Sequence, residues 1–322
     1  MKYITLGKTD LTVSRVAFGT WQLGGDWGST DATSAANAIR TAADNGVTFF
    51  DTAQAYGFGA SEALLAKGLQ GLRRDDLVIA TKGGLRKEGN GVARDSSAKA
   101  ITEGVESSLR SLDTDYIDLY QVHWPDTKTP FEETADALAK LIAAGKIRHV
   151  GVSNFSVTQM DAFSESLPVE TLQPPYHLLH RTIEAEILPY TSAHNIGVLV
   201  YGPLAHGMLG GGLRPDTTFA PDDWRSSSAD FQGGVYLHNL ERVSELADFA
   251  QRELGITIGQ LAVAWTLANP AVHVAIVGTR NPAHVQEALD AAGVTLSTST
   301  LAGIADIMKD ATPLAGPSPE TV

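Results

Sequence analysis

The chain has 322 residues, 43% of them hydrophobic, and it contains no cysteine. The absence of cysteine excludes disulfides, thiolate nucleophiles and cysteine-ligated zinc or iron–sulfur centres. A formal net charge of −13 argues against nucleic-acid and anionic-membrane partners, because both require a local excess of Lys and Arg. The start of the chain lacks an apolar signal-peptide core, and no run approaches the roughly 20 apolar residues of a membrane span. We therefore expect a cytoplasmic protein.

Apolar, β-branched segments of strand length recur along the chain, and helix-patterned segments such as 31–45 and 97–112 separate them. This alternation is typical of repeated β–α units and a parallel sheet. We predict eight strands, at 16–23, 47–52, 77–82, 117–123, 149–153, 170–173, 197–201 and 274–278. Eight such units in a chain of this length predict a (β/α)8 TIM barrel, which typically needs about 250 residues plus insertions.

A doubly wound sheet is the alternative fold. Its dinucleotide fingerprint, G-x-G-x-x-G after the first strand, is missing here, because that position holds Phe18-Gly19-Thr20-Trp21. No acidic residue follows about 20 positions later in a Rossmann arrangement either. We therefore favour the barrel and expect any nucleotide to be held in another way.

Three segments fall outside the repeat, although we treat residues 1–322 as a single domain. Residues 2–14 predict an N-terminal β-hairpin that could plug the barrel floor. Residues 206–236 form a long loop after the seventh strand, rich in Gly, Pro, Ser and Asp; we interpret it as a lid over a ligand, with a mobile insertion as the alternative. Residues 311–322, with three prolines, predict a flexible, solvated tail.

Four polar side chains lie at or just beyond the ends of three consecutive predicted strands: Asp51, Tyr56, Lys82 and His123. In a TIM barrel these strand ends and their loops build the active site. An ammonium close to a phenol favours its ionised form, and a carboxylate would hold that ammonium in place. A site with these groups could protonate a carbonyl oxygen while a hydride donor from elsewhere reduces the carbonyl carbon.

Each of these side chains also has a simpler explanation when it is taken alone. Asp51 could cap a helix, Tyr56 could be an amphipathic residue at a rim, and Lys82 could be a snorkelling surface cation. His123 could be a satisfied buried imidazole beside Trp124. Their joint placement on successive strand ends favours a functional site.

Several short motifs of the chain together resemble those of the aldo-keto reductases. They are Gly19-Thr20-Trp21, Phe50-Asp51-Thr52-Ala53 with Tyr56-Gly57 and Ser61-Glu62, Ala80-Thr81-Lys82, Asp118-Leu119-Tyr120-Gln121-Val122-His123, Gly151-Val152-Ser153-Asn154-Phe155, and Tyr201-Gly202-Pro203-Leu204. The motifs extend from the first predicted strand to the seventh. The resemblance implies a (β/α)8 barrel that uses NADPH without a Rossmann domain.

The same resemblance implies roles for the four polar residues. Tyr56 would be the general acid, Lys82 would lower its pKa, Asp51 would pair with Lys82, and His123 would orient the carbonyl. The implied reaction is hydride transfer from NADPH to a small-molecule aldehyde or ketone. No metal is required.

Cofactor contacts are implied in the second half of the chain. Ser153, Asn154 and Gln173 would contact the nicotinamide carboxamide, and Tyr201 would stack on the ring. Asn154-Phe155-Ser156 matches an N-glycosylation sequon, but the chain shows no export signal, and the implied cofactor contact explains these residues instead. Taken alone, the glycine-rich stretch from Gly202 favours a flexible loop, but with the resemblance it predicts a belt over the dinucleotide. The remaining contacts expected here are Gly19, Thr20, Trp21, Asp51, Pro203, Leu204, Gly207 and Gly278.

The adenosine end of the cofactor would be held after the last strand. Thr279 and Arg280 resemble a clamp on the 2′-phosphate, and a guanidinium suits a phosphate bidentately, so NADPH is expected over NADH. His284 and Glu287 would contact the adenosine. Many family members carry Gln or Arg where His284 stands and Asn where Ala288 stands, so the strength of the preference stays open.

The substrate pocket is expected to include Trp21, Tyr56, Arg86, His123, Trp124 and Trp224. This set accepts many apolar or sugar-like carbonyls, so the sequence does not select the substrate, and it does not indicate an oligomeric state. A second hypothesis is a cofactor-sensing regulatory protein of the potassium-channel β-subunit type, with slow turnover. Single-turnover kinetics with bound NADPH would separate the two hypotheses.

Overall fold

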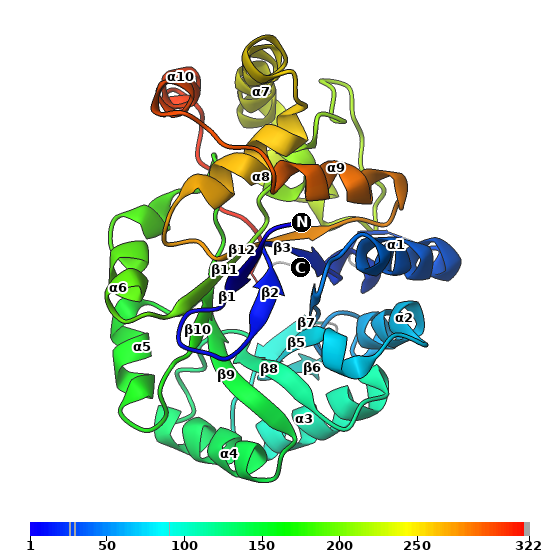
Figure 1. Ribbon diagram of the computed structural model, residues 1–322, viewed down its shortest axis with the longest axis vertical. Helices are drawn as coiled ribbons and strands as arrows, with labels where there is room; N and C mark the ends of the chain where they lie inside the picture. Colours follow the sequence, from blue (N-terminus) through cyan, green and yellow to red (C-terminus); the bar gives the residue numbers. More distant parts are fainter. Residues whose placement is uncertain (26, 29, 90, 319–322) are drawn as a thin grey trace.

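The computed structural model describes residues 1–25, 27–28, 30–89 and 91–318. Within them, eight parallel strands close into a barrel surrounded by helices (Figure 1). The strands are β3 (Val16–Gly19), β4 (Phe49–Asp51), β5 (Val78–Gly83), β8 (Ile117–Val122), β9 (Ile147–Ser153), β10 (Thr171–Gln173), β11 (Gly197–Tyr201) and β12 (Val274–Gly278). All eight predicted strands and the TIM barrel are confirmed. The doubly wound alternative is wrong, because β12 pairs with β3 and closes the ring.

Helices cover the outside of the barrel, and polar caps explain where several of them start. α1 (Ala32–Asp44) begins after Asp31, whose carboxylate accepts from the Ser34 N–H at 2.6 Å, as expected of an N-cap. The other helices are α2 (Ala60–Leu69), α3 (Ala98–Leu112), α4 (Phe131–Ala143), α5 (Val157–Ser164), α6 (Ile187–Ala193), α7 (Gly233–Leu254), α8 (Ile258–Ala268), α9 (Ala283–Ala291) and α10 (Thr298–Met308). No helix of the described chain is long and apolar enough to span a membrane.

The predicted N-terminal hairpin is confirmed. β1 (Tyr3–Thr5) and β2 (Thr12–Ser14) pair antiparallel and lie across one end of the barrel (Figure 1). The Leu6 side chain between them is fully buried in a cluster with inward-facing barrel residues. A Cβ on Gly197 would lie 2.8 Å from the Leu6 side chain, so this glycine makes room for the plug.

The expected long loop after the seventh strand contains more regular structure than its composition indicates. It holds the 3₁₀ turns η4 (Ala205–Gly210), η5 (Trp224–Ser226) and η6 (Ala229–Phe231), and it ends where α7 begins at Gly233.

The first predicted strand is shorter than expected. It ends at Gly19, and the residues that follow form the turn η1 (Trp21–Leu23).

A second hairpin, which the sequence did not predict, follows the third barrel strand. β6 (Leu85–Glu88) and β7 (Gly91–Arg94) pair antiparallel. Most residues of both strands are exposed or half-buried. Their sequences therefore lack the buried apolar pattern on which strand prediction depends.

The solvated tail expected at 311–322 is wrong for the residues that the structure describes. The Leu314 side chain is 2% exposed within the core, and its N–H donates to Leu179 O at 2.9 Å. The Thr312 N–H donates to Asn239 Oδ1. The buried Leu314 side chain and these two hydrogen bonds hold the segment against the protein, although its prolines had predicted a solvated tail. Residues 319–322 of that expectation lie outside the described residues.

Candidate active site

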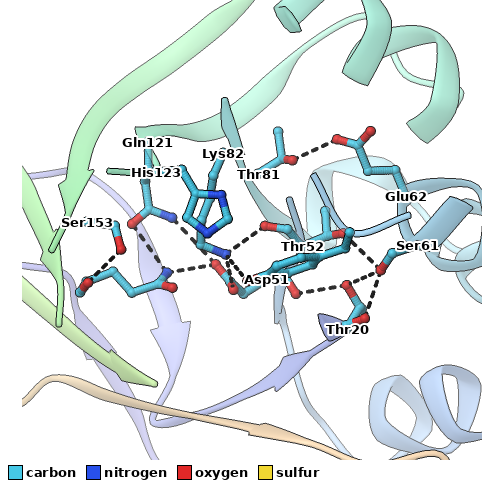
Figure 2. Close-up of polar contacts among 12 residues, drawn as sticks. Thr20, Asp51, Thr52, Ser61, Glu62, Thr81, Lys82, Gln121, His123 and Ser153 are labelled. Atoms are coloured by element: carbon cyan, nitrogen blue, oxygen red, sulfur yellow. Dashed lines mark hydrogen bonds and ion pairs between the residues drawn. The ribbon is translucent and has the colours of Figure 1, made fainter. Parts of the chain in front are cut away.

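A buried ion pair lies at the carboxyl ends of β4 and β5 (Figure 2). Lys82 Nζ donates to Asp51 Oδ1 at 2.6 Å, to Thr52 O at 2.8 Å and to Tyr56 Oη at 3.3 Å. The Lys82 side chain is 1% exposed. Burial lowers the Lys82 pKa, and the adjacent Asp51 carboxylate opposes that shift. An ammonium has three hydrogens to donate, so this one is fully satisfied without water.

Hydroxyl groups tie the ends of β3 and β4 together beside the ion pair. Ser61 Oγ lies 2.8 Å from Thr20 O and 2.7 Å from Thr20 Oγ1, at hydrogen-bonding distance from both, and the Thr20 N–H donates to Asp51 O at 3.0 Å. On the far side of Lys82, Thr81 Oγ1 donates to the buried Glu62 carboxyl at 2.7 Å. Burial raises the pKa of Glu62.

His123 follows β8 and faces Tyr56, with ring centroids 5.7 Å apart at 79°. The imidazole is 9% exposed. Burial, and then the positive charge of Lys82, lower the His123 pKa well below its ordinary value. The ring is therefore uncharged at neutral pH.

Amide and hydroxyl side chains from three further strands complete the network. Gln173 Nε2 donates to Asp51 Oδ2 at 2.9 Å, and Ser153 Oγ donates to Gln173 O at 2.7 Å. Asn154 Nδ2 donates to Ser153 Oγ at 3.1 Å, while Asn154 Oδ1 accepts from the Tyr201 hydroxyl at 3.0 Å. Hydrogen bonds thus connect the second barrel strand to the fifth, sixth and seventh.

These groups meet at a cavity of about 290 Å³ at the carboxyl ends of the strands. Sixteen of the predicted site residues line it: Gly19, Thr20, Trp21, Asp51, Tyr56, His123, Trp124, Ser153, Asn154, Gln173, Tyr201, Gly202, Pro203, Leu204, Gly207 and Gly278. The ammonium of Lys82 lies beneath this wall, bonded to Asp51 and Tyr56.

Comparison with known proteins identifies this arrangement. The sequence model of the aldo/keto reductase family matches residues 15–309. The chain belongs to the aldo/keto reductase family. It is 41% identical to aldo-keto reductase YhdN of Bacillus subtilis over 312 residues, which are 96% of this chain and 94% of that protein.

Solved structures of aldo/keto reductases have the same fold. The glycerol dehydrogenase AKR11B4 of Gluconobacter oxydans superposes with a TM-score of 0.87 at 40% identity, covering 98% of this chain and 97% of that one. An aldo/keto reductase of Klebsiella pneumoniae, solved with NADP and acetate, gives a TM-score of 0.75 at 30% identity, covering 99% and 98%.

The predicted adenosine contacts of this aldo/keto reductase lie beyond the cavity wall, in the segment that follows Gly278. Arg280 Nη1 donates to Trp27 O at 3.0 Å, and the Glu287 carboxylate accepts from Thr257 Oγ1. Thr279 Oγ1 accepts from the Asn281 N–H, and the side chain of that asparagine contacts His284. The four predicted residues therefore have partners within the protein in this structure.

Two predicted substrate residues also lie outside the cavity lining. Arg86 is half-exposed and pairs with Glu88 and Asp95. Trp224 stacks on Trp21 with ring centroids 6.0 Å apart and 22° between the planes. Trp224 thus supports the cavity wall from behind.

Sequence reasoning missed part of the lining: Gln22, Trp27, Ala55, Gly57, Phe58, Leu85, Val92, His206, Ile276, Val277, Pro317 and Ser318. Leu85 and Val92 belong to the unpredicted hairpin, and Pro317 belongs to the segment expected in solvent. Trp27 had a usable signal, because it lies in the loop after the first strand, where TIM-barrel sites are built.

Proposed function

We propose that this aldo/keto reductase reduces an aldehyde or ketone to an alcohol with NADPH, and that Tyr56 donates the proton. The observation that carries the proposal is the contact of Tyr56 Oη with Lys82 at 3.3 Å, on the wall of the cavity. This buried set of acid, cation and carboxylate favours catalysis over the cofactor-sensing alternative. The reaction class follows from the family, while the residue roles are our assignment.

The proton donor depends on the charge next to it. When Tyr56 gives its proton to a developing alkoxide, a phenolate remains, and the Lys82 ammonium stabilises that negative charge at short range. Burial alone would favour an uncharged amine. The Asp51 carboxylate favours the charged form of Lys82, and through Lys82 it supports proton donation by Tyr56.

His123 can orient a carbonyl without adding a second positive charge. Its lowered pKa leaves an uncharged imidazole, which carries one N–H donor. The ring faces Tyr56 across the cavity wall. We propose that a substrate carbonyl oxygen accepts hydrogen bonds from both side chains, which places it for proton transfer.

The cavity lining fits a nicotinamide dinucleotide, which supplies the hydride when it is bound. We assign Ser153, Asn154 and Gln173 to the carboxamide and Tyr201 to the ring face. Further along the wall, Gly202 and Gly207 have φ of +68° and +101°. Such glycines let the main chain come close to a pyrophosphate, together with Gly19, Thr20, Trp21, Asp51, Pro203, Leu204 and Gly278.

We assign the 2′-phosphate to Arg280 and Thr279, and the adenosine to His284 and Glu287. The guanidinium of Arg280 gives the phosphate a bidentate partner. The NADP complex of the Klebsiella pneumoniae relative supports NADPH as the cofactor. We further propose that the whole chain is one domain, and the cytoplasmic location stays a prediction.

For the substrate we propose a pocket walled by Trp21, Trp124 and the catalytic pair Tyr56 and His123. Trp224 would act through Trp21, on which it stacks. Arg86 would act through the hairpin that brings its neighbour Leu85 to the cavity.

Substituting Tyr56→Phe tests the proton-donor assignment. We expect kcat for an aromatic aldehyde such as nitrobenzaldehyde to fall at least about 100-fold, because a phenyl ring has no proton to give. The dissociation constant of NADPH, measured by quenching of protein fluorescence, should stay within about twofold. Tyr116→Phe is a matched control, since the Tyr116 hydroxyl bonds to the exposed Asp75 and lies outside the cavity lining. Turnover that survives in Tyr56→Phe with unchanged NADPH binding would contradict the assignment.

A further inference from the structure

Gln121 is a buried polar residue on β8, two positions before His123, that the proposed mechanism leaves without a role. Gln121 is 0% exposed. Gln121 Oε1 accepts from Gln173 Nε2 at 3.3 Å, and Gln121 Nε2 approaches Asp51 Oδ2 at 3.5 Å. Figure 2 shows Gln121 beside the Lys82–Asp51 pair. A Cβ on Gly151 would lie 3.1 Å from Gln121 Cγ, so this glycine leaves room for the side chain.

The contacts with Asp51 and Gln121 together determine which way the Gln173 amide points. A primary amide has a donor end and an acceptor end of similar size, and its partners decide between the two orientations. Asp51 Oδ2 and Gln121 Oε1 are both acceptors, and they take the two hydrogens of Gln173 Nε2. The carbonyl oxygen of Gln173 is therefore turned away from both acceptors.

This orientation matters because Gln173 lines the cavity. Turning its amide over would lose two hydrogen bonds and bring its carbonyl oxygen against the Asp51 carboxylate. Without Gln121, one buried hydrogen of Gln173 Nε2 would lose its partner, and leaving a buried donor unpaired is unfavourable. Gln121 thus helps to keep an acceptor, and not a donor, at the cavity end of Gln173.

We propose that Gln121 is a positioning residue that fixes the Gln173 carbonyl oxygen as an acceptor for a primary carboxamide, and that it also steadies the second oxygen of Asp51. The inference rests on the proposed function, since the ligand with a primary carboxamide is the nicotinamide cofactor. It adds that Gln121, on β8, makes the site selective for a carboxamide N–H by holding the acceptor oxygen of Gln173 toward the cavity.

Substitutions can separate the roles of the amide oxygen and the amide nitrogen of Gln121. Gln121→Met has similar volume and removes both the acceptor and the donor. Gln121→Glu keeps an acceptor for Gln173 but places a second carboxyl beside Asp51. Two carboxyls at this distance share a proton, so this variant retains the Gln173 contact and makes the region of Asp51 dependent on pH.

The test compares NADPH with its acetylpyridine analogue, in which a methyl ketone replaces the carboxamide and the N–H donors are gone. Dissociation constants come from quenching of protein fluorescence, which does not require turnover. We expect the intact protein to prefer NADPH by about tenfold, the value of one well-made hydrogen bond. In Gln121→Met the constant for NADPH should rise about tenfold while that for the analogue changes less than about twofold.

Gln121→Glu should retain the preference for NADPH of the intact protein, and the pH profile of its kcat should gain a new inflection. A second apolar variant, Gln121→Leu, repeats the measurement if Gln121→Met does not fold. Gln251→Met, at an exposed position of α7, controls for the exchange of glutamine for methionine and should leave both constants unchanged.

Two results would overturn the inference. The preference for NADPH could survive in the apolar variants, or both ligands could weaken equally, which would indicate only lost packing. Failure of the proposed function looks different, because the intact protein itself would then neither bind NADPH nor oxidise it with an aldehyde.

Discussion

At the scale of single residues, burial decides which groups of the site carry charge. Lys82 and His123 are both enclosed, and burial lowers the pKa of each. Lys82 has the Asp51 carboxylate at 2.6 Å, whereas the nearest charge acting on His123 is the like charge of Lys82. The site therefore pairs one ammonium with one neutral imidazole.

A pH profile tests the neutral imidazole. The lowered pKa means that His123 takes up a proton only far below 6.5, so its charge should not change between about pH 6 and pH 8. Gln is uncharged and keeps an N–H donor. We expect the ratio of kcat/KM for the intact protein and His123→Gln, with NADPH saturating, to stay constant over this range, although both values differ. A sigmoidal change of that ratio with a midpoint near 6.5 would contradict a neutral His123.

Single residues also show how far sequence reasoning extends. Asp51, Tyr56, Lys82 and His123 could be placed together because each lies at or just beyond the end of a strand that faces the same cavity. Gln121 could not, although it lies within the same run as His123. Its contacts depend on side chains 70 and 52 residues away, and an inward-facing Gln in a buried strand has no pattern of its own.

At the scale of elements, the sequence predicted the buried barrel strands and missed the partly exposed hairpin that follows the third of them. The eight barrel strands are largely buried on both faces, as is typical of parallel strands, and each was found. Most residues of β6 and β7 are exposed or half-buried, so these strands had no such signal. Residues 206–236 were expected as one loop because Gly, Pro, Ser and Asp are frequent there, but turns held by side chains organise residues 205–231.

Arg225 is central to that organisation. Its guanidinium donates to Asp223 Oδ2 at 2.6 Å and to His206 O at 3.1 Å. It also lies 4.6 Å from the ring centroid of Trp27 and 4.4 Å from that of Phe219. One side chain thus joins the turns after β11 to the loop after β3, on the side of the cavity where both contribute lining.

Substituting Arg225→Met should loosen this segment without unfolding the barrel. The nearly buried Asp223 carboxylate would lose its partner, which costs on the order of 2 kcal/mol. Amide hydrogen exchange of residues 205–231 should therefore accelerate by about 10- to 100-fold, while that of the barrel strands stays the same. Arg252→Met, at an exposed site beside Glu253, is the control. Equal acceleration in the strands would show that Arg225 supports the whole fold instead.

At the scale of the whole molecule, the two ends of the barrel have different tasks. The carboxyl ends of the strands carry the cavity, and the opposite end is closed by the β1–β2 hairpin. In TIM barrels the first end is typically catalytic and the second stabilising. His149 links the hairpin to the barrel at this closed end, since its ring contacts Asp10 Oδ1 at 2.8 Å and Glu170 Oε1 at 2.9 Å.

This link predicts how stability depends on pH. The hydrogen bond to Glu170 and the contact with Asp10 raise the His149 pKa above 6.5, although burial acts against them. The stabilisation is complete below the pKa of the unfolded chain, about 6.5, and is lost as pH rises through the higher folded pKa. The intact protein should therefore have a higher free energy of unfolding than His149→Gln below about pH 6.5, and this advantage should decrease as the pH rises above that value. The ring is partly solvated, so we expect a difference of at most about 1 kcal/mol in unfolding free energy by urea titration. An advantage that is constant or grows with pH would rule out a protonated His149 as the link.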